Sequence, residues 1–240
     1  MKKNLLTLAV ASATFIFAHP ASAERNGWYA GVGFGQSEMS DWLSGGDTVA
    51  LLDASASASG VIDFLGDVSD GSDDSDSAGK LFGGYHFTEN FAIEASYVDL
   101  GEASARATAN GLFLLDDGAG GIVTEGSLGN KVTSESQAVT LDAVGLFKVG
   151  TMFDVFAKVG LFYADSKLKY SAYADFDIGS ASASDSISDK STNLHYGLGA
   201  NAWFTENLGI RLEWEQFNDV EVEDAESDIS LLSASILYRF

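Results

Sequence analysis

Eight segments of the chain alternate between apolar residues and polar or small residues with a period of two. The C-terminal segment is a clear example, because Phe240, Tyr238, Ile236, Ala234 and Leu232 are all apolar or aromatic while the positions between them are mixed. Such alternation is the signature of a β-strand with one apolar face. The eight segments are 27–37, 78–87, 91–100, 137–149, 153–165, 192–204, 208–217 and 229–240. Each has about the length that a tilted strand needs to cross a bilayer.

The faces opposite the apolar ones carry too much charge for a dry core between two sheets. These charged positions are Glu94, Asp142, Lys158, Arg211 and Glu213. Buried between sheets, each would be costly unless it were paired. In a narrow barrel the apolar side chains face lipid instead, and the charged ones neutralise one another inside. The pattern therefore predicts an all-β fold, a closed eight-stranded antiparallel up-and-down transmembrane β-barrel.

The connections between these segments alternate between short and long. The short ones are 88–90, 150–152 and 205–207, and the long ones are 38–77, 101–136, 166–191 and 218–228. Outer-membrane barrels have short periplasmic turns and long extracellular loops, so this order predicts which end of the barrel faces outward. Serine- and alanine-rich runs at 55–60 and 180–184 are either mobile loop tips or extensions of the strands above the membrane.

Aromatic residues gather at the two predicted ends of the barrel. Phe87, Phe91, Phe147, Phe153, Phe204, Tyr238, Phe240 and Trp28 lie near the short turns. Tyr97, Tyr163, Tyr196 and Trp214 lie toward the long connections. Two aromatic girdles at the membrane interfaces are expected of such a barrel, although simple packing explains each position equally well.

The N-terminus has the three parts of a secretory signal peptide. Lys2 and Lys3 are followed by an apolar stretch at 5–17 and by the small residues 21–23. We therefore predict a signal peptide at 1–23 and an outer-membrane β-barrel domain at 24–240. The alternative is an uncleaved N-terminal anchor, for which the apolar stretch is short.

Composition excludes several classes of function. The formal net charge is −22, and without the leader it becomes −24, from 11 basic and 35 acidic residues. Nucleic-acid binding needs a basic surface, so this charge argues against it, and equally against docking onto anionic lipid. There is no cysteine, and hence neither a disulfide framework nor a cysteine-ligated metal site.

Acidic residues concentrate in two of the predicted loops. Segment 38–77 holds ten acidic residues, including the run 70–76, and segment 219–228 holds six. Clustered carboxylates can bind Ca²⁺, but the spacing does not match a calcium-loop motif. We therefore predict solvated acidic loops, which could still meet divalent ions bridging lipopolysaccharide, and no metal site or cofactor of the protein itself.

Two histidines outside the leader, His86 and His195, are the candidates for catalysis. A hydrolytic site needs a nucleophile and a base within hydrogen-bond reach. Both histidines lie on predicted inward faces of different segments, in no catalytic motif. Histidines that fill the barrel interior are the preferred interpretation, so an enzyme is not predicted.

The barrel segments resemble the transmembrane domain of the outer-membrane protein A family. The resemblance is carried by Phe82-Gly83-Gly84-Tyr85 leading to Phe91-Ala92-Ile93-Glu94-Ala95-Ser96-Tyr97, by Leu208-Gly209-Ile210-Arg211-Leu212-Glu213-Trp214-Glu215, and by the terminal Tyr238-Arg239-Phe240. It implies an eight-stranded barrel in which inward ion pairs close or gate the interior. By resemblance, Glu94 and Arg211 take two positions of this network, with Lys158 and Glu213 beside them.

The chain departs from the family at two further interior positions. Asn201 stands where the family has an acidic residue, and Val144 where it has a basic one, which predicts a smaller network. Residues Ile236, Tyr238 and Phe240 resemble the signal that the barrel-assembly machinery reads. Members often carry a peptidoglycan-binding domain after the barrel, and the sequence predicts none here, since it ends at Phe240.

These features together predict an integral outer-membrane protein of a Gram-negative bacterium with a structural or surface-interaction role. Its expected partners are outer-membrane lipid and lipopolysaccharide, the barrel-assembly machinery and surface ligands of the loops. The first alternative is a narrow channel for small or hydrophobic solutes, although an eight-stranded interior is nearly filled by side chains. The second is a lipid-modifying outer-membrane enzyme.

Overall fold

The computed structural model describes residues 27–40, 43–222 and 225–240. The predicted signal peptide lies outside these residues. The elements are β1 (Gly27–Met39), α1 (Gly45–Ala58), β2 (Val61–Asp73), β3 (Ser75–Thr88), β4 (Phe91–Leu115), β5 (Ile122–Val149), β6 (Phe153–Phe176), β7 (Gly179–Trp203), β8 (Leu208–Val222) and β9 (Ala225–Arg239). No helix in the described part of the chain is long and apolar enough to cross a membrane.

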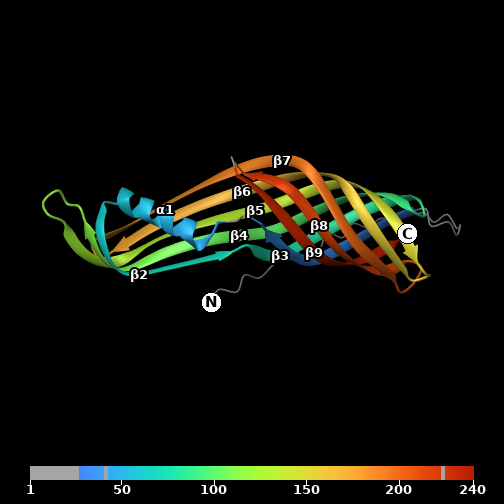
Figure 1. Cartoon of the computed structure of the whole chain (residues 1–240), viewed down its shortest axis with the longest axis horizontal. Coiled ribbons are helices and arrows are strands. Elements are labelled where there is room, and N and C mark those ends of the chain that lie inside the picture. Colours follow the sequence, from blue (N-terminus) through green and yellow to red (C-terminus); the bar gives the residue numbers. More distant parts are fainter. Residues whose placement is uncertain (1–26, 41–42, 223–224) are drawn as a thin grey trace.

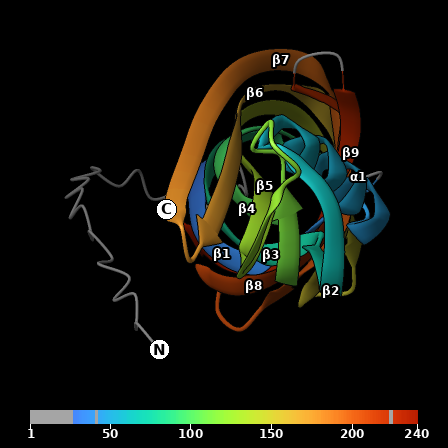
Figure 2. The same ribbon diagram turned by 90° about the vertical axis from the view of Figure 1, so that its left-hand side faces the viewer.

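Eight of these strands form a ring of antiparallel neighbours. The sheet runs in the order β2-β4-β3-β1-β9-β8-β7-β6-β5, and a further pairing of β4 with β5 joins its two sides. Strand β1 pairs with both β3 and β9, so the first and last strands of the ring are neighbours. Viewed end-on, the strands surround a common interior (Figure 2). The predicted all-β antiparallel fold is confirmed.

Side-chain exposure alternates along the ring as the sequence pattern predicts. On β1, Tyr29 is 2% exposed, whereas Val32 and Phe34 are 60% and 67% exposed. Successive side chains of a strand point to opposite faces of the sheet. The apolar faces of the eight segments therefore point away from the ring and the polar faces point into it.

Strand β2 is the ninth strand of the described sheet and pairs with β4 alone. Its residues lie beside 104–115 of β4, whereas β3 lies beside 91–99 of the same strand. Strands β2 and β3 thus follow one another along β4. Figure 1 shows β2 and α1 together at one end of the elongated molecule, with the C-terminus at the other end.

Most of the predicted long connections are strand extensions and not long loops. Segment 101–136 continues β4 and β5, and segment 166–191 continues β6 and β7. The run at 180–184 is therefore a strand extension, and the run at 55–60 includes the end of α1. The serine, alanine and glycine content of these segments hid their strand character, since such residues are poor indicators of a sheet.

A β-bulge explains why the alternation is hard to follow on β4. The pairing of β4 with β5 shifts between Asp99 and Glu102, and Gly101 has a φ of +78°. A bulge adds one residue to a strand, and glycine readily adopts the left-handed conformation that this one needs. Inward positions on β4 are consequently even-numbered before the bulge and odd-numbered after it, at Ala103, Ala105 and Ala107.

Helix α1 begins at a capping box and packs on the inner face of the strand extensions. The backbone N–H and the hydroxyl of Ser44 donate to the carboxylate of Asp47, and these hydrogen bonds lower the pKa of that carboxyl. Leu52 lies in a buried cluster with Ala107, Ala109, Phe113, Leu128 and Ala174. This helix was not predicted, because the many acidic residues of 38–77 indicated a solvated loop.

Candidate functional site: the ion-pair cluster inside the ring

The four residues predicted for an interior network lie inside the ring. Glu94 is on β4, Lys158 on β6, and Arg211 and Glu213 are on β8, and each is at most 3% exposed. Arg211 Nη1 lies 2.7 Å from Glu94 Oε2, and Lys158 Nζ lies 2.7 Å from Glu213 Oε1. Lys158 Nζ is also 3.7 Å from Glu94 Oε1. The structure thus brings all four side chains into one cluster.

Two more charged residues belong to the same cluster. Lys80 Nζ lies 2.6 Å from Glu213 Oε2 and 2.7 Å from Glu215 Oε2. Lys158 Nζ lies 2.5 Å from Glu215 Oε1. The signal for both was present in the sequence, because Lys80 is on the inward face of its strand and Glu215 follows Glu213 by two positions. The network is larger than the two departures from the family led us to expect.

The charges of this cluster balance. Three cations, Lys80, Lys158 and Arg211, meet three carboxylates, Glu94, Glu213 and Glu215. An unpaired ion in a buried site costs several kcal/mol, whereas a paired and hydrogen-bonded one is tolerated. Equal numbers of the two signs therefore allow all six groups to be buried together.

The Glu94–Arg211 ion pair crosses the full width of the ring. Strand β4 is separated from β8 by three strands in either direction around the eight-stranded ring. The Arg211 guanidinium also packs between aromatic rings, 4.6 Å from the centroid of Phe82 and 4.4 Å from that of Phe156. Such cation–π contacts are strongest where water is excluded. One side chain thus links opposite walls of the interior.

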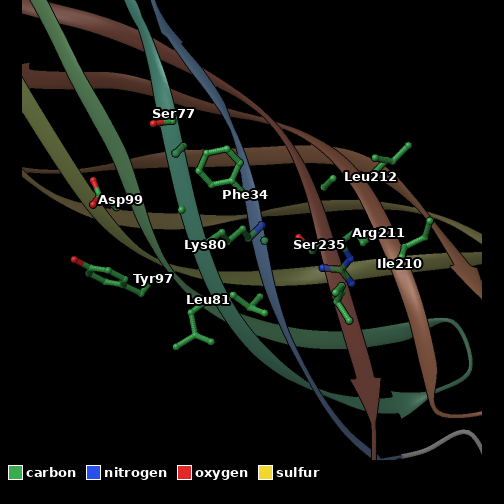
Figure 3. Close-up of a pocket in the computed structure, with 16 residues that line it drawn as sticks. Phe34, Ser77, Lys80, Leu81, Tyr97, Asp99, Ile210, Arg211, Leu212 and Ser235 are labelled. Carbon is green, nitrogen blue, oxygen red and sulfur yellow. The ribbon is translucent and has the colours of Figure 1, made fainter. Parts of the chain in front are cut away.

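The Lys80 side chain crosses the inner faces of β1 and β9 to reach β8. Figure 3 shows Lys80 on β3 and Arg211 on β8, with β1 and β9 separating them. The inward residues at this height are Gly33 on β1 and Ser235 on β9, which pair with one another, and Gly33 also pairs with Lys80. A Cβ atom at Gly33 would meet Ser235 Oγ at 2.1 Å. The glycine therefore leaves the space that the Ser235 hydroxyl occupies.

The outer surface of the same four strands has a hollow of about 950 Å³. Its exposed apolar lining includes Val32, Phe34, Leu81, Leu212 and Ile236. In Figure 3, Leu81 and Leu212 point away from the side chains of Lys80 and Arg211. This part of the sheet thus has apolar side chains on its outer face and charged side chains on its inner face.

The two positions that depart from the family also face the interior. Asn201 Oδ1 accepts a hydrogen bond of 3.0 Å from Arg211 Nε, so a neutral amide orients the guanidinium where the family has an acid. Val144 is buried in an apolar cluster with Tyr29, Phe82 and Phe156. Arg211 thus has a polar partner on one side and the apolar cluster on the other.

In the described part of the chain, His195 lies between two carboxylates. His195 Nδ1 lies 2.8 Å from Asp142 Oδ1, and His195 Nε2 lies 3.2 Å from Glu215 Oε1. Both ring nitrogens therefore face carboxylates, and neither faces a hydroxyl. His86 packs against the ring of Tyr29, with 4.7 Å between ring centroids. The described residues include no group of three or more His, Cys, Asp or Glu side chains placed to hold a metal ion.

The three residues predicted for assembly lie on the outer face of the last strand. Ile236 and Tyr238 pair with Val32 and Ala30 of β1. The Phe240 N–H donates to the Trp28 carbonyl at 3.0 Å, and its ring stacks edge-on against Tyr238. All three side chains are exposed. They are accessible on the outer surface, although their role in assembly stays a prediction.

The sequence profile of the OmpA-like transmembrane domain matches residues 23–240. The chain belongs to this family. Its members are outer-membrane domains, so the protein is an integral protein of the outer membrane of a Gram-negative bacterium. The predicted family and the predicted outer-membrane localisation are confirmed.

Comparison with individual proteins gives only distant likenesses. No curated protein matches the sequence. Among solved structures, Neisserial surface protein A is 12% identical, with a TM-score of 0.45, over 89% of this chain and 97% of that one. OprG from Pseudomonas aeruginosa is 11% identical, with a TM-score of 0.44, over 90% and 97%. Ail of Yersinia pestis is 13% identical, with a TM-score of 0.37, over 88% and 99%. All three likenesses are weak.

Proposed function

We propose that the ring is a closed transmembrane β-barrel whose interior is sealed by ion pairs, and that the protein acts through its extracellular surface. In this arrangement the short turns face the periplasm, and α1, β2 and the extensions of β4–β7 stand outside the membrane. The protein has a structural or surface-interaction role and neither conducts solutes nor catalyses a reaction. Surface ligands of this extracellular part, outer-membrane lipid and the barrel-assembly machinery are its partners.

The single observation that carries this proposal is the Glu94–Arg211 ion pair that spans the ring. Its two side chains are at most 2% exposed, and aromatic rings pack against the guanidinium. Lys80 and Lys158 fill the space beside it through their ion pairs with Glu213. A solute crossing the interior would have to separate ions that are buried away from water, which is energetically costly.

A narrow channel is the second candidate, and the ionisable lining of the interior favours it. The two are separated by conductance measurements in planar bilayers with the wild-type protein, Glu94→Ala and Arg211→Ala. A sealed barrel predicts no steady conductance in the wild type and brief openings in the variants, where the plug is incomplete. Steady conductance of the wild type would establish the channel instead.

A lipid-modifying enzyme is disfavoured by the carboxylates on both sides of His195. Deleting the gene and recording lipid A mass spectra tests this directly, and a changed spectrum that the wild-type gene restores would overturn the non-catalytic role.

The barrel itself is tested by outer-membrane fractionation and by electrophoresis in detergent with and without boiling. A folded barrel runs as a compact band that boiling retards, and a protein recovered without detergent as a soluble monomer would refute it.

A further inference from the structure

Strand β7 has one edge without a partner strand over much of its length. It pairs with β6 along residues 179–202, but with β8 only at 195–203. Among the described residues, no strand pairs with 179–194 on the side away from β6. In Figure 1, this part of β7 follows the upper margin of the half that holds α1 and β2. The strand extensions thus form an open sheet in the order β2-β4-β5-β6-β7, whose two margins are β2 and β7.

The two margins of this sheet differ in charge. An edge strand exposes unpaired N–H and C=O groups with which another chain can pair, and charged residues on the edge are a common protection against such pairing. Residues 61–73 of β2 carry four aspartates: Asp63, Asp67, Asp70 and Asp73. Residues 179–188 of β7 carry Asp185 and no other charged residue. The edge of β7 is therefore the one that is open to another strand.

The same part of β7 is exposed on both faces. Every residue from 179 to 188 is exposed, including Ile187 at 40%. In an antiparallel ladder, every second residue directs its N–H and C=O groups to a given side. The residues of 179–188 that point away from β6 therefore offer their backbone groups to a strand added at this edge. Addition of a strand to an exposed sheet edge is a common mode of protein recognition.

The sequence of this edge suits a second copy of the same strand. Two copies related by a two-fold axis perpendicular to the sheet pair as antiparallel strands about one central residue, with outward side chains opposite outward ones. The outward residues are the even-numbered ones, since Ser191 and His195 of the same strand are buried inward. With the centre at Ser182, Ala183 or Ser184, every outward pair is serine opposite serine. None of these three registers places two charged residues opposite one another, and opposed serine hydroxyls can hydrogen-bond.

Antiparallel pairing turns one copy end for end relative to the other. Strand β7 runs from the far tip of the molecule, at Gly179, to the end with the short turns, at Trp203. The rings of two paired copies therefore lie at opposite ends of the pair. Copies side by side in one membrane have parallel β7 strands and cannot pair in this way, whereas copies in two facing membranes can.

We propose that the free edge of β7 binds the same edge of a second copy, as an antiparallel pair of strands that joins two facing outer membranes. The inference deepens the surface-interaction role proposed above and rests on the orientation given there. Both copies are acidic, but exposed charges more than about 8 Å apart are largely screened at an ionic strength of about 0.15 M. The acidic margin at β2 lies on the other side of each sheet, away from the paired edges.

A single introduced cysteine tests the pairing, because the chain has no cysteine of its own. The variants are Ser182→Cys, Ala183→Cys and Ser184→Cys, with Ser69→Cys on β2 as the control at the other margin. Each is folded into nanodiscs, oxidised mildly and run on non-reducing gels. A disulfide needs Cα atoms within about 7 Å, so a cysteine bonds to its own copy only close to the two-fold axis. Two positions from that axis, the two copies of one residue are about 13 Å apart along the strand.

We expect one of the three β7 variants to form most of the cross-linked dimer, and the β2 control to stay monomeric. The variant that cross-links then identifies the central residue of the register. Equal cross-linking of all three β7 variants, or stronger cross-linking of Ser69→Cys, overturns the inference.

Charge exchange tests the same pairing without a covalent bond. In each of the three registers, Ser182→Lys/Ser184→Lys places lysine opposite lysine, and Ser182→Asp/Ser184→Asp places aspartate opposite aspartate. Vesicles carrying either variant should cluster about tenfold less than wild-type vesicles, because opposed like charges destabilise a ladder and the many copies on a vesicle multiply the loss. Mixing the two kinds of vesicle should restore clustering, which is measured by dynamic light scattering. Wild-type vesicles that stay separate, or mixed vesicles that do not recover, overturn the inference.

The same variants separate this inference from the proposed function. Each is fractionated and run in detergent electrophoresis with and without boiling. Normal outer-membrane location and a compact folded band, without cross-linking or clustering, refute the docking edge alone. Loss of outer-membrane location in the wild type refutes both proposals.

Discussion

Replacing Arg211 with methionine is expected to expose how strongly the interior ion pairs depend on one another. Methionine keeps much of the side-chain volume, so the main loss is the charge that pairs with Glu94 at 2.7 Å. The cluster would then hold three carboxylates and only two cations. Removing one partner of a buried pair costs about 3–5 kcal/mol, because the remaining ion is left without compensation.

The structure places this variant near the lower end of that range. Glu94 retains the Tyr29 hydroxyl as a donor at 2.8 Å and Lys158 at 3.7 Å. We therefore expect the free energy of unfolding to fall by about 3 kcal/mol. The double variant Glu94→Gln/Arg211→Met restores equal numbers of positive and negative groups. It should be more stable than Arg211→Met alone, with a coupling energy of about 2 kcal/mol.

The assay is reversible urea unfolding in lipid vesicles, followed by tryptophan fluorescence and by the shift of the folded band in detergent electrophoresis. Lys148→Met is the matched control, because it breaks an exposed ion pair with Glu89 and should cost less than about 1 kcal/mol. The reasoning is refuted if Arg211→Met lies within about 1 kcal/mol of the wild type, or if adding Glu94→Gln destabilises it further.

Three other changes test separate parts of the structure. Gly33→Val should destabilise the ring by well over 1 kcal/mol, because the new Cβ would collide with β9. Gly79→Val has open space at its Cβ and should leave the stability nearly unchanged. The free energies of unfolding of the two variants are compared by urea unfolding. The Ser44 hydrogen bonds lower the pKa of Asp47. Protection of the α1 amides from hydrogen exchange should therefore be complete above the ordinary pKa of 3.8 and should decline as the pH falls below that value. Asp47→Asn should remove this pH dependence, and an unchanged pH profile in that variant would contradict the capping role. Deleting Phe240 should reduce the amount of folded protein in the outer membrane while leaving refolding in vesicles unchanged, and equal losses in both would assign the residue to stability instead of assembly.

The ring could be predicted from the sequence because the eight predicted segments share one pattern. Outward positions are apolar, inward positions are small or polar, and the same rule places Glu94 and Arg211 in the interior before their contacts are known. Which inward charges meet could not be predicted, because that depends on register. Lys80 reaches Glu213 across two intervening strands, β1 and β9, and the alternation along each strand does not indicate which strands lie between them.

The half of the molecule that holds α1 and β2 was harder to predict for a different reason. There the outward residues of the strands are mostly polar or small, and the Gly101 bulge reverses the alternation on β4. Helix α1 is held by small contacts, with Leu52 packed on alanines and the Asn130 side-chain amide donating to the Thr48 carbonyl at 3.1 Å. Neither the short apolar pattern of the helix nor the alanines opposite it distinguishes this arrangement from a loop.

The outward residues of four adjoining strands change from apolar to polar at one level along the strands. Tyr97 on β4 pairs with Val139 on β5, and Val139 pairs with Tyr163 on β6. Two positions further along, the outward row is entirely polar: Asp99, Gln137, Asp165 and Lys190 on successive strands β4–β7. Along these strands the outer face changes from apolar to polar, while the inner face stays buried. In the transmembrane barrel proposed above, the limit of the hydrocarbon layer would lie between these two rows of residues.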